Sequence, residues 1–498
     1  MSFGPPPSIY TQSALAADTA RRRRRTKLLG AVAVIAAVAL GGGGWLLASG
    51  GDSAPADAEQ SLVQSPDDIR ETTERAPVSP EGLLMIEHDE GNLAKTNDAK
   101  PRYAPGTWAT DKVMVKGVAD RLEGYDIALD ADEKAWTRKL DGHICATSRH
   151  VTADGRTAVV VQPPQPAGSE KEGVCDRVVF FDLDTGKKLW QKKMPGAGSA
   201  FVTTTNLTLT KGVVAVAWGQ GSVAYDMKSG KQLWNSTLGS KCEDKALAGG
   251  RALLSLLSCG SLPDVTFQVQ ELDPRTGKAR WTYRVASGVQ TVYLPSSDPP
   301  VLAVAAGDSE VTDLISLDGE GRHRTTIALN GYEAKCGERY FGLSFFGEYE
   351  ACDGVVVGRT RAFVTSDENI AAGEPSDWIV AFDLATGRTT GKFDGRELQK
   401  VHPLRMSGDD LLIYRRGAGA VAPAAVVRWN PATDQETPLL LFTLPEDDDG
   451  ELSDPEQSDI LYEKGRVFFG KRELAADDKY PTDPVLMALA VGSAGLKH

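Results

Sequence analysis

The sequence FFDLDTGKKLW at residues 180–190 decides the fold, because it describes a strand, a tight turn and a second strand. The apolar run Val178–Phe181 leads into the turn. Asp182 can hydrogen-bond the backbone two residues further on, and Gly186 can adopt the positive φ that closes the turn. The second strand ends on a large aromatic side chain, Trp190. The stretch therefore predicts a β-hairpin.

This hairpin recurs along the chain. Residues 224–234 (AYDMKSGKQLW) and 271–281 (ELDPRTGKARW) keep Asp, Gly and Trp at the same offsets. Weaker copies stand at residues 316–321, 381–388, 428–433 and 488–492, and an early copy runs from residue 128 to Trp136. Between Asp positions the steps are 52, 44, 47, 45, 65, 47 and 60 residues. Short strands repeating every 40 to 50 residues or so are typical of propeller blades rather than of helical solenoids.

Each unit also supplies two strands before its hairpin. In the third unit the expected strands are residues 206–210, 213–218, 222–227 and 232–238. Four antiparallel strands make one blade, so the eight copies predict an eight-bladed propeller, or a seven-bladed one if an end unit is partial. The last unit lacks a fourth strand after a turn near Gly492, whereas the first begins with an extra extended segment, residues 106–110. We expect this N-terminal strand to complete the last blade and close the ring.

The pattern Ala-Leu-Asp-x-x-Thr-Gly-Lys-x-Leu-Trp resembles the repeat of the pyrroloquinoline-quinone-like (PQQ-like) β-propellers over about residues 105–498. This superfamily holds quinoprotein dehydrogenases and non-catalytic scaffolds such as the outer-membrane assembly lipoprotein, so the resemblance implies an all-β fold and leaves activity open. It also implies that the hairpin residues pack between adjacent blades; a ligand-stacking array is the alternative for the indoles. The residues concerned are Trp136, Trp190, Trp234, Trp281, Gly186, Gly230, Gly277 and Gly387.

The amino-terminal region contains a membrane signal. Arg21–Arg25 and Lys27 precede the uncharged residues 28–48, which match the length of about 20 residues that a helix needs to cross a bilayer. The positive-inside rule predicts a single-pass helix whose N-terminus stays in the cytoplasm. A cleaved signal peptide, cut near residues 53–58, is the alternative.

The predicted helix divides the chain into four parts. Residues 1–27 are expected to be a disordered basic cytoplasmic tail, and residues 49–80, rich in Ser, Ala, Pro and acidic residues, a flexible extracytoplasmic linker. Residues 81–498 form the predicted propeller outside the cytoplasm. Because residues 1–27 carry +5, the net charge of −13 leaves −18 for the rest. An acidic ectodomain disfavours nucleic acid or an anionic membrane face as its partner.

All six cysteines follow the predicted helix, and an even number in an exported domain favours disulfides. Fifteen pairings are possible, and we expect neighbours to pair because each neighbouring pair lies within one repeat unit. The expected pairs are Cys145 with Cys175, Cys242 with Cys259, and Cys336 with Cys352, the last in a long insert at residues 332–376. No C-x-x-C spacing occurs and the six histidines are scattered singly, which disfavours a zinc site.

Catalytic signatures are absent from the sequence. The resemblance to quinoprotein dehydrogenases would imply adjacent cysteines beside the quinone and a Glu/Asn/Asp set for calcium, and neither can be aligned here. No nucleophile elbow, phosphate-binding loop or zinc helix motif occurs. The acidic run at residues 446–451 lacks the alternating spacing of a calcium loop and is interpreted as a solvated loop.

The sequence therefore predicts a membrane-anchored extracytoplasmic propeller that acts as a protein-interaction scaffold or sensor, with no catalysis, cofactor or metal. Its expected partner is a protein or another component of the cell envelope. The alternative hypothesis is a quinone-dependent dehydrogenase or a propeller that binds a small ligand.

Overall fold

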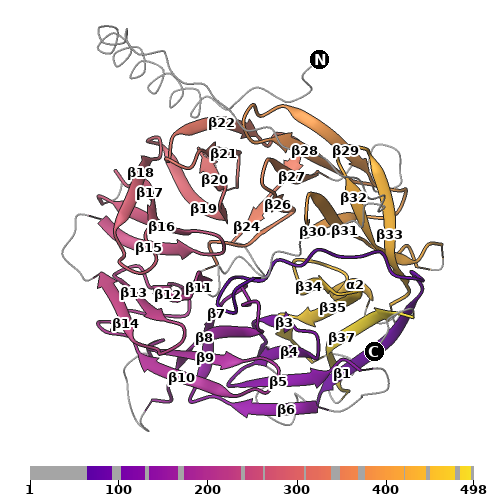
Figure 1. Cartoon of the computed structure of the whole chain (residues 1–498), viewed down its shortest axis with the longest axis horizontal. Helices are drawn as coiled ribbons and strands as arrows, with labels where there is room; N and C mark the ends of the chain where they lie inside the picture. The colour runs from indigo at the N-terminus through magenta and orange to yellow at the C-terminus, as the bar shows by residue number, and fades with distance from the viewer. Residues whose placement is uncertain are drawn as a thin grey trace, which may run out of the picture.

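The computed structural model describes residues 64–91, 102–128, 134–165, 173–236, 242–261, 264–307, 310–337, 348–367, 376–419, 421–444, 449–476 and 483–494. In these residues the strands form eight antiparallel sheets arranged around a ring (Figure 1). We call the eight large sheets blades A to H, in the order in which their innermost strands occur along the chain. The predicted eight-bladed propeller is confirmed.

Blades A to D each use four consecutive strands. Blade A consists of β3 (Thr107–Ala109), β4 (Val113–Val118), β5 (Arg121–Asp126) and β6 (Lys134–Lys139); blade B of β7 (His143–Thr147), β8 (Arg156–Gln162), β9 (Arg177–Asp182) and β10 (Lys188–Lys193); blade C of β11 (Asn206–Thr210), β12 (Val213–Ala217), β13 (Ser222–Asp226) and β14 (Gln232–Ser236); blade D of β15 (Cys242–Ala248), β16 (Leu253–Cys259), β17 (Thr266–Leu272) and β18 (Ala279–Arg284).

Blades E to H include the one with the insert and the one that closes the ring. Blade E consists of β19 (Val289–Ser297), β20 (Pro300–Ala306), β21 (Asp313–Leu317) and β22 (His323–Ala328); blade F of β23 (Tyr332–Glu333), β26 (Val355–Val357), β27 (Arg361–Ser366), β28 (Trp378–Asp383) and β29 (Thr389–Asp394); blade G of β30 (Val401–Ser407), β31 (Asp410–Arg415), β32 (Ala424–Asn430) and β33 (Gln435–Phe442); blade H of β34 (Ser458–Glu463), β35 (Arg466–Lys471), β37 (Val485–Ser493) and β1 (Gly82–Glu90).

Three small elements lie between blades. The pair β24 (Lys335–Cys336) and β25 (Cys352–Asp353) belongs to the insert of blade F, and β2 (Arg102–Tyr103) pairs with β36 (Glu473–Leu474). The short helix α2 (Asp449–Leu452) precedes blade H.

The ring is closed by an N-terminal strand, but not by the one predicted. Blade H takes its outer strand from β1, which pairs antiparallel with β37. Residues 107–109 instead form β3, the fully buried first strand of blade A. The predicted turn near Gly492 is also wrong, because β37 runs through residues 485–493 and pairs with β1 along its length. An apolar, extended segment is compatible with either an inner or an outer strand, so its pattern could not decide the position.

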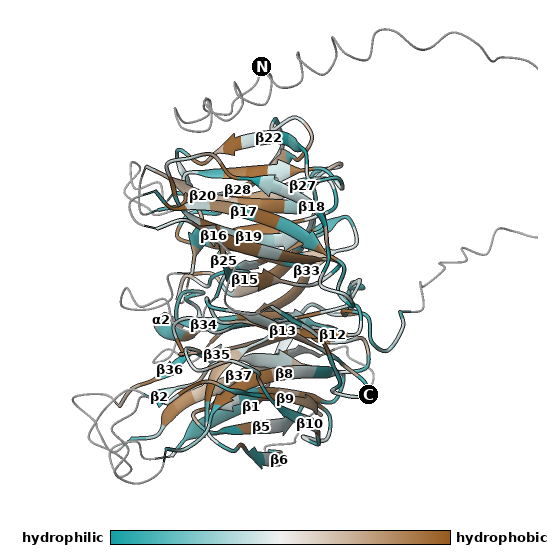
Figure 2. Ribbon diagram, turned by 90° about the vertical axis from the view of Figure 1, so that its left-hand side faces the viewer, coloured by the Kyte–Doolittle hydropathy of each residue, from teal (hydrophilic) through white to brown (hydrophobic). Residues whose placement is uncertain are grey.

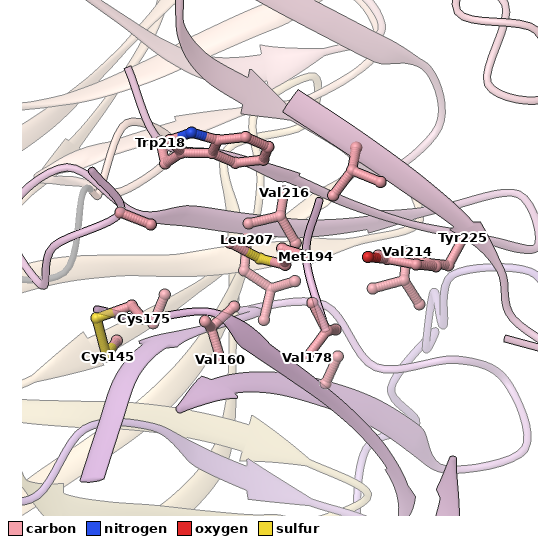
Figure 3. Close-up of a cluster of buried hydrophobic side chains, with 14 of the residues drawn as sticks. Cys145, Val160, Cys175, Val178, Met194, Leu207, Val214, Val216, Trp218 and Tyr225 are labelled. Atoms are coloured by element: carbon pink, nitrogen blue, oxygen red, sulfur yellow. A yellow bond between two sulfur atoms is a disulfide. The ribbon is translucent and has the colours of Figure 1, made fainter. Parts of the chain in front are cut away.

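Hydrophobic cores fill the spaces between neighbouring blades. The described residues form eight clusters of buried side chains, and each draws its members mainly from two adjacent blades. Figure 3 shows the cluster between blades B and C, where Val160 and Val178 face Leu207, Val214 and Val216. Seen from the side, apolar segments run along strands within the disc, whereas polar residues concentrate toward the turns (Figure 2). Each blade is therefore stabilised by burying apolar surface against both neighbours.

Residues 64–80, which we call the strap, lie on one face of the ring before β1 begins. Figure 1 shows this indigo segment running from the centre of the ring across blade H to the rim. The segment makes backbone contacts with blade B and with the rim: Ile69 bridges Thr152, and Leu441 donates its N–H to the carbonyl of Pro80 at 2.6 Å. The prediction of a free linker up to residue 80 is therefore wrong for these residues, because their polar side chains pair with the blades.

The predicted tail and membrane helix, residues 1–27 and 28–48, lie outside the described residues. Within the described part of the chain, no helix is long and apolar enough to cross a membrane.

Candidate functional site

The recurrent hairpins place the predicted Trp and Gly residues at the blade boundaries. In blade B, Asp182 accepts hydrogen bonds from the backbone and hydroxyl of Thr185 at 2.9 and 2.6 Å, and Gly186 has a φ of 62°. A Cβ on Gly186 would lie 2.4 Å from the indole of Trp136, which comes from blade A. The same indole donates its Nε1–H to the carbonyl of Leu183 at 3.1 Å. The indole of one blade therefore packs against the hairpin turn of the next blade.

Two further blades repeat this contact. Trp190 lies against Gly230 and donates to the carbonyl of Met227 at 2.7 Å. Trp234 lies against Gly277 and donates to the carbonyl of Pro274 at 2.8 Å. These partly exposed indoles pack between neighbouring blades, as the repeat predicts.

The last two predicted packing residues differ from this pattern. Trp281 also contacts a turn glycine of the next blade, Gly321, but its indole bonds Glu271 of its own blade at 2.8 Å. Gly387 meets no indole, since a Cβ there would lie 2.7 Å from Oγ1 of Thr325. Blade E carries no Trp on its outer strand, and threonine takes the place of the indole.

The six cysteines form the three predicted disulfides: Cys145–Cys175, Cys242–Cys259 and Cys336–Cys352, with Cα–Cα distances of 6.0, 4.0 and 3.9 Å. The first joins β7 to the segment before β9 within blade B (Figure 3), the second joins β15 to β16 within blade D, and the third joins β24 to β25 at the base of the insert in blade F. All three occur within one blade unit.

The insert of blade F reaches the centre of the ring. The inner edge of β27 pairs with two short pieces, β23 and β26, and the chain between them leaves the sheet. Glu350, in this insert, accepts hydrogen bonds at Oε1 from the backbone N–H of Gly249 at 2.7 Å and from Oγ1 of Thr208 at 3.0 Å. His150 Nε2 lies 3.0 Å from the same oxygen. Blades B, C and D therefore converge on one carboxylate supplied by blade F.

Neighbouring contacts fix the same segment. Arg149 donates to the carbonyl of Glu350 at 2.7 Å, and Leu294 of blade E donates its N–H to the carbonyl of Tyr349 at 2.7 Å. Glu350 is only 8% exposed. Burial raises the pKa of its carboxyl, but the His150 charge and the hydrogen bonds outweigh burial and leave the pKa below its ordinary value. The carboxylate is therefore held ionised at the centre of the ring.

Around Glu350 the described residues form a network of hydrogen bonds. Glu350 is occupied by donors rather than grouped with other carboxylates, and among the described residues no three His, Cys, Asp or Glu side chains gather to hold a metal ion. A pocket of about 110 Å³ lies between blades A and B, lined by Leu122, Phe181 and Lys188 among others. Cofactor sites are usually about 300 Å³ or larger. Of the acidic run at residues 446–451, residues 446–448 lie outside the described chain, and Glu451 pairs with Lys471 at 2.7 Å.

The strap makes a second polar site, on the face that carries the turns between the first two strands of the blades. Its acidic side chains pair with arginines of separate blades: Asp67 with Arg156 at 2.6 Å, Glu71 with Arg251 at 2.5 Å, and Glu74 with Arg405 at 2.5 Å. Glu74 is 4% exposed, and burial raises the pKa of its carboxyl despite the Arg405 charge.

Sequence reasoning did not find these two sites. Glu350 and His150 are 200 residues apart, and His150 was counted among singly scattered histidines. The strap arginines are contributed by different blades, so no spacing joins them. The one usable signal was the long insert at residues 332–376, because loops that interrupt a regular repeat often carry function.

Comparisons with known proteins agree with the fold. The model of a family described as outer membrane protein assembly factor BamB matches residues 92–251 and 175–433. Among solved structures, BamB from Moraxella catarrhalis is 12% identical, covers 78% of this chain and 96% of its own, and gives a TM-score of 0.41. The quinohemoprotein alcohol dehydrogenase ADHIIG from Pseudomonas putida HK5 is 12% identical, with coverage of 86% and 79% and a TM-score of 0.48. The comparison with curated proteins found no match.

The two matched ranges overlap and together span more than half of the chain. They cover blades A to F completely and most of blade G. The protein therefore belongs to the PQQ-like β-propeller family that this model describes, that of outer membrane protein assembly factor BamB.

Proposed function

We propose that this protein is a membrane-anchored, extracytoplasmic propeller that acts as a protein-interaction scaffold or sensor and carries out no catalysis. The observation that carries the proposal is the buried carboxylate of Glu350, through which the described part of the blade F insert is tied to blades B, C and D. A carboxylate occupied in this way supports a structural role for the insert and leaves the exposed faces and the rim for contact. Membership of the BamB family supports a scaffold role without identifying a partner.

The membrane anchor rests on the sequence. Five arginines next to 21 uncharged residues support an N-terminus in the cytoplasm and a propeller outside it. Three disulfides support an oxidising compartment for the propeller.

Fractionation and site-specific crosslinking in the native cell test the proposal. A photoreactive residue would replace Val421, which lies in the turn between β31 and β32 and is 78% exposed, or, as a matched control, the fully buried Val426 of the same blade. We expect the chain to stay in the membrane after an alkaline carbonate wash, and the Val421 position to give a discrete crosslinked protein that the Val426 position does not.

Two results would contradict parts of this proposal. Release of a shortened chain into the medium would overturn the anchor and favour the cleaved signal peptide. If the exposed position, Val421, and the buried position, Val426, gave the same crosslinks, there would be no support for a specific partner at the turn that contains Val421.

A further inference from the structure

The strap is attached to the ring almost entirely by polar contacts. Of residues 64–80, only Glu74 is buried, and the apolar Ile69 is partly exposed. The strap has four acidic and two basic side chains, so it carries a net charge of −2. A segment with so little buried apolar surface is held by ion pairs and hydrogen bonds, which exchange with solvent and weaken as salt rises.

The surface beneath the strap presents arginines from blades B, D, F and G. Three of these arginines also pair with carboxylates of the ring: Arg156 with Asp154, Arg405 with Glu463 and Arg428 with Asp410. We define the arginine groove by five side chains from four blades: Arg156 of blade B, Arg251 of blade D, Arg359 of blade F, and Arg405 and Arg428 of blade G. Arg251 and Arg359 both face Glu71, with closest distances of 2.5 and 3.6 Å. Arg405 and Arg428 bind the backbone carbonyls of Thr72 and Glu74 at 2.7 and 3.1 Å.

Blade B also forms backbone hydrogen bonds with the extended chain of the strap. Arg70 donates its N–H to the carbonyl of Val151 at 2.8 Å, and Ala153 donates its N–H to the carbonyl of Asp68 at 2.8 Å. Ile69 thereby forms an antiparallel bridge with Thr152. Pairing of an extended peptide with a strand-like edge, together with arginines that select acidic side chains, is a known mode of peptide recognition.

We propose that the arginine groove is a docking site for an extended acidic peptide segment of a partner protein, and that the strap occupies this site in cis. The inference rests on the proposed scaffold function and names the chemistry of its partner. As part of the same chain, the strap competes at a high effective concentration, so a partner binds only when the strap is loosened. Charge complementarity favours an acidic peptide over any basic or apolar one.

The test uses the full chain and a labelled synthetic peptide of residues 64–77 as the probe. In the variant Asp67→Asn/Glu71→Gln the strap loses its three ion pairs with Arg156, Arg251 and Arg359 but keeps the buried Glu74, so the attachment beside β1 is retained. We expect this variant to bind the peptide at least about tenfold more tightly than the unmodified chain does, because less of the groove is occupied. The affinity should fall as salt is raised from low to high.

Three controls make the result decisive. A scrambled peptide of the same composition should not bind, and neither should a peptide with lysine in place of Asp67 and Glu71. Adding Arg251→Glu and Arg359→Glu to the variant should abolish binding while the thermal melt shows a folded protein. The proposed docking site would be contradicted if the scrambled peptide bound as tightly as the peptide of residues 64–77, or if the folded Asp67→Asn/Glu71→Gln variant bound no peptide. Peptide binding and the thermal melt are independent of membrane fractionation and of crosslinking at Val421. Failure of the docking site is therefore distinct from failure of the scaffold proposal.

Discussion

The seam between blades A and B and the seam between blades H and A join neighbouring blades with different chemistry. At the A–B seam a neutral indole, Trp136, covers the turn at Gly186 and bonds a backbone carbonyl. At the H–A seam Glu90 of β1 bonds Arg102 at 2.6 Å and Arg121 at 2.5 Å. The first contact is part of the repeat, whereas the second joins residues that no repeat unit shares.

The closing seam also buries charge beyond Glu90. Glu123 contacts Arg121, Lys134 and the hydroxyl of Tyr125. Burial opposes ionisation of Glu123, but these hydrogen bonds outweigh burial and lower its pKa to about 2. Lys116 has no exposed surface and donates to the backbone carbonyls of Ala104 and Gly106. The A–B, B–C and C–D seams are thus specified by a local motif, and the closing seam by an ionic network of single residues.

The largest expected effect comes from breaking the neutral seam. Gly186→Ala would place a Cβ 2.4 Å from the Trp136 ring at a φ of 62°. Backbone strain and overpacking together should lower the free energy of unfolding by about 3 to 4 kcal/mol, measured by urea denaturation. Gly196→Ala, with a φ of 72° and open space around it, isolates the strain alone and should cost about 1 to 2 kcal/mol. Equal losses for the two variants would show that the indole contact contributes nothing.

Breaking the charged seam should cost somewhat less. Glu90→Ala leaves Arg102 and Arg121 without their shared carboxylate, and both arginines are only partly exposed. We expect a loss of about 3 kcal/mol in the free energy of unfolding. Glu87→Ala, at an exposed position of the same strand, should change stability by less than about 0.5 kcal/mol. A Glu90→Ala variant as stable as Glu87→Ala would contradict the role given to this network.

The smallest effect is a change in pH dependence. Burial lowers the pKa of Lys116 to about 8, so between pH 8 and its ordinary value of 10.5 the unfolded chain binds more protons than the folded chain. Stability contributed by this group therefore rises with pH in that window, by about 1 kcal/mol for each pH unit. Lys116→Met should remove this rise in urea titrations at several pH values, and Lys139→Met, whose side chain is 82% exposed, should retain it. An unchanged slope for Lys116→Met would show that Lys116 does not titrate as described.

The features that the sequence predicted are the local ones. The Asp-x-x-Thr-Gly turn, the strands beside it and the disulfides within single units depend on residues close in the chain, which is why eight blades could be counted. Blade closure was assigned to residues 106–110 because they are extended and come first. The true closing strand, β1, reads GLLMIEHDE, and its exposed Leu83 and Leu84 and acidic end show no strand alternation.

The polar sites could not be predicted because their members are distant in sequence. Glu350 meets donors 101 to 200 residues away, and Glu74 meets Arg405 across 331 residues. The strap has the composition of a linker, and it is held by arginines and backbone groups that the ring presents. Such contacts follow from closure of the ring, which no single repeat encodes.

The most direct test of the scaffold account is a binding titration of the purified chain with pyrroloquinoline quinone and Ca²⁺, followed by dye reduction with simple alcohols. Because Glu350 is already bonded by three blades and no cluster of metal ligands gathers among the described residues, we expect no stoichiometric quinone binding and no dye reduction above that of the free cofactor. Stoichiometric uptake of the quinone with alcohol-dependent dye reduction would contradict the account and establish a quinone-dependent dehydrogenase.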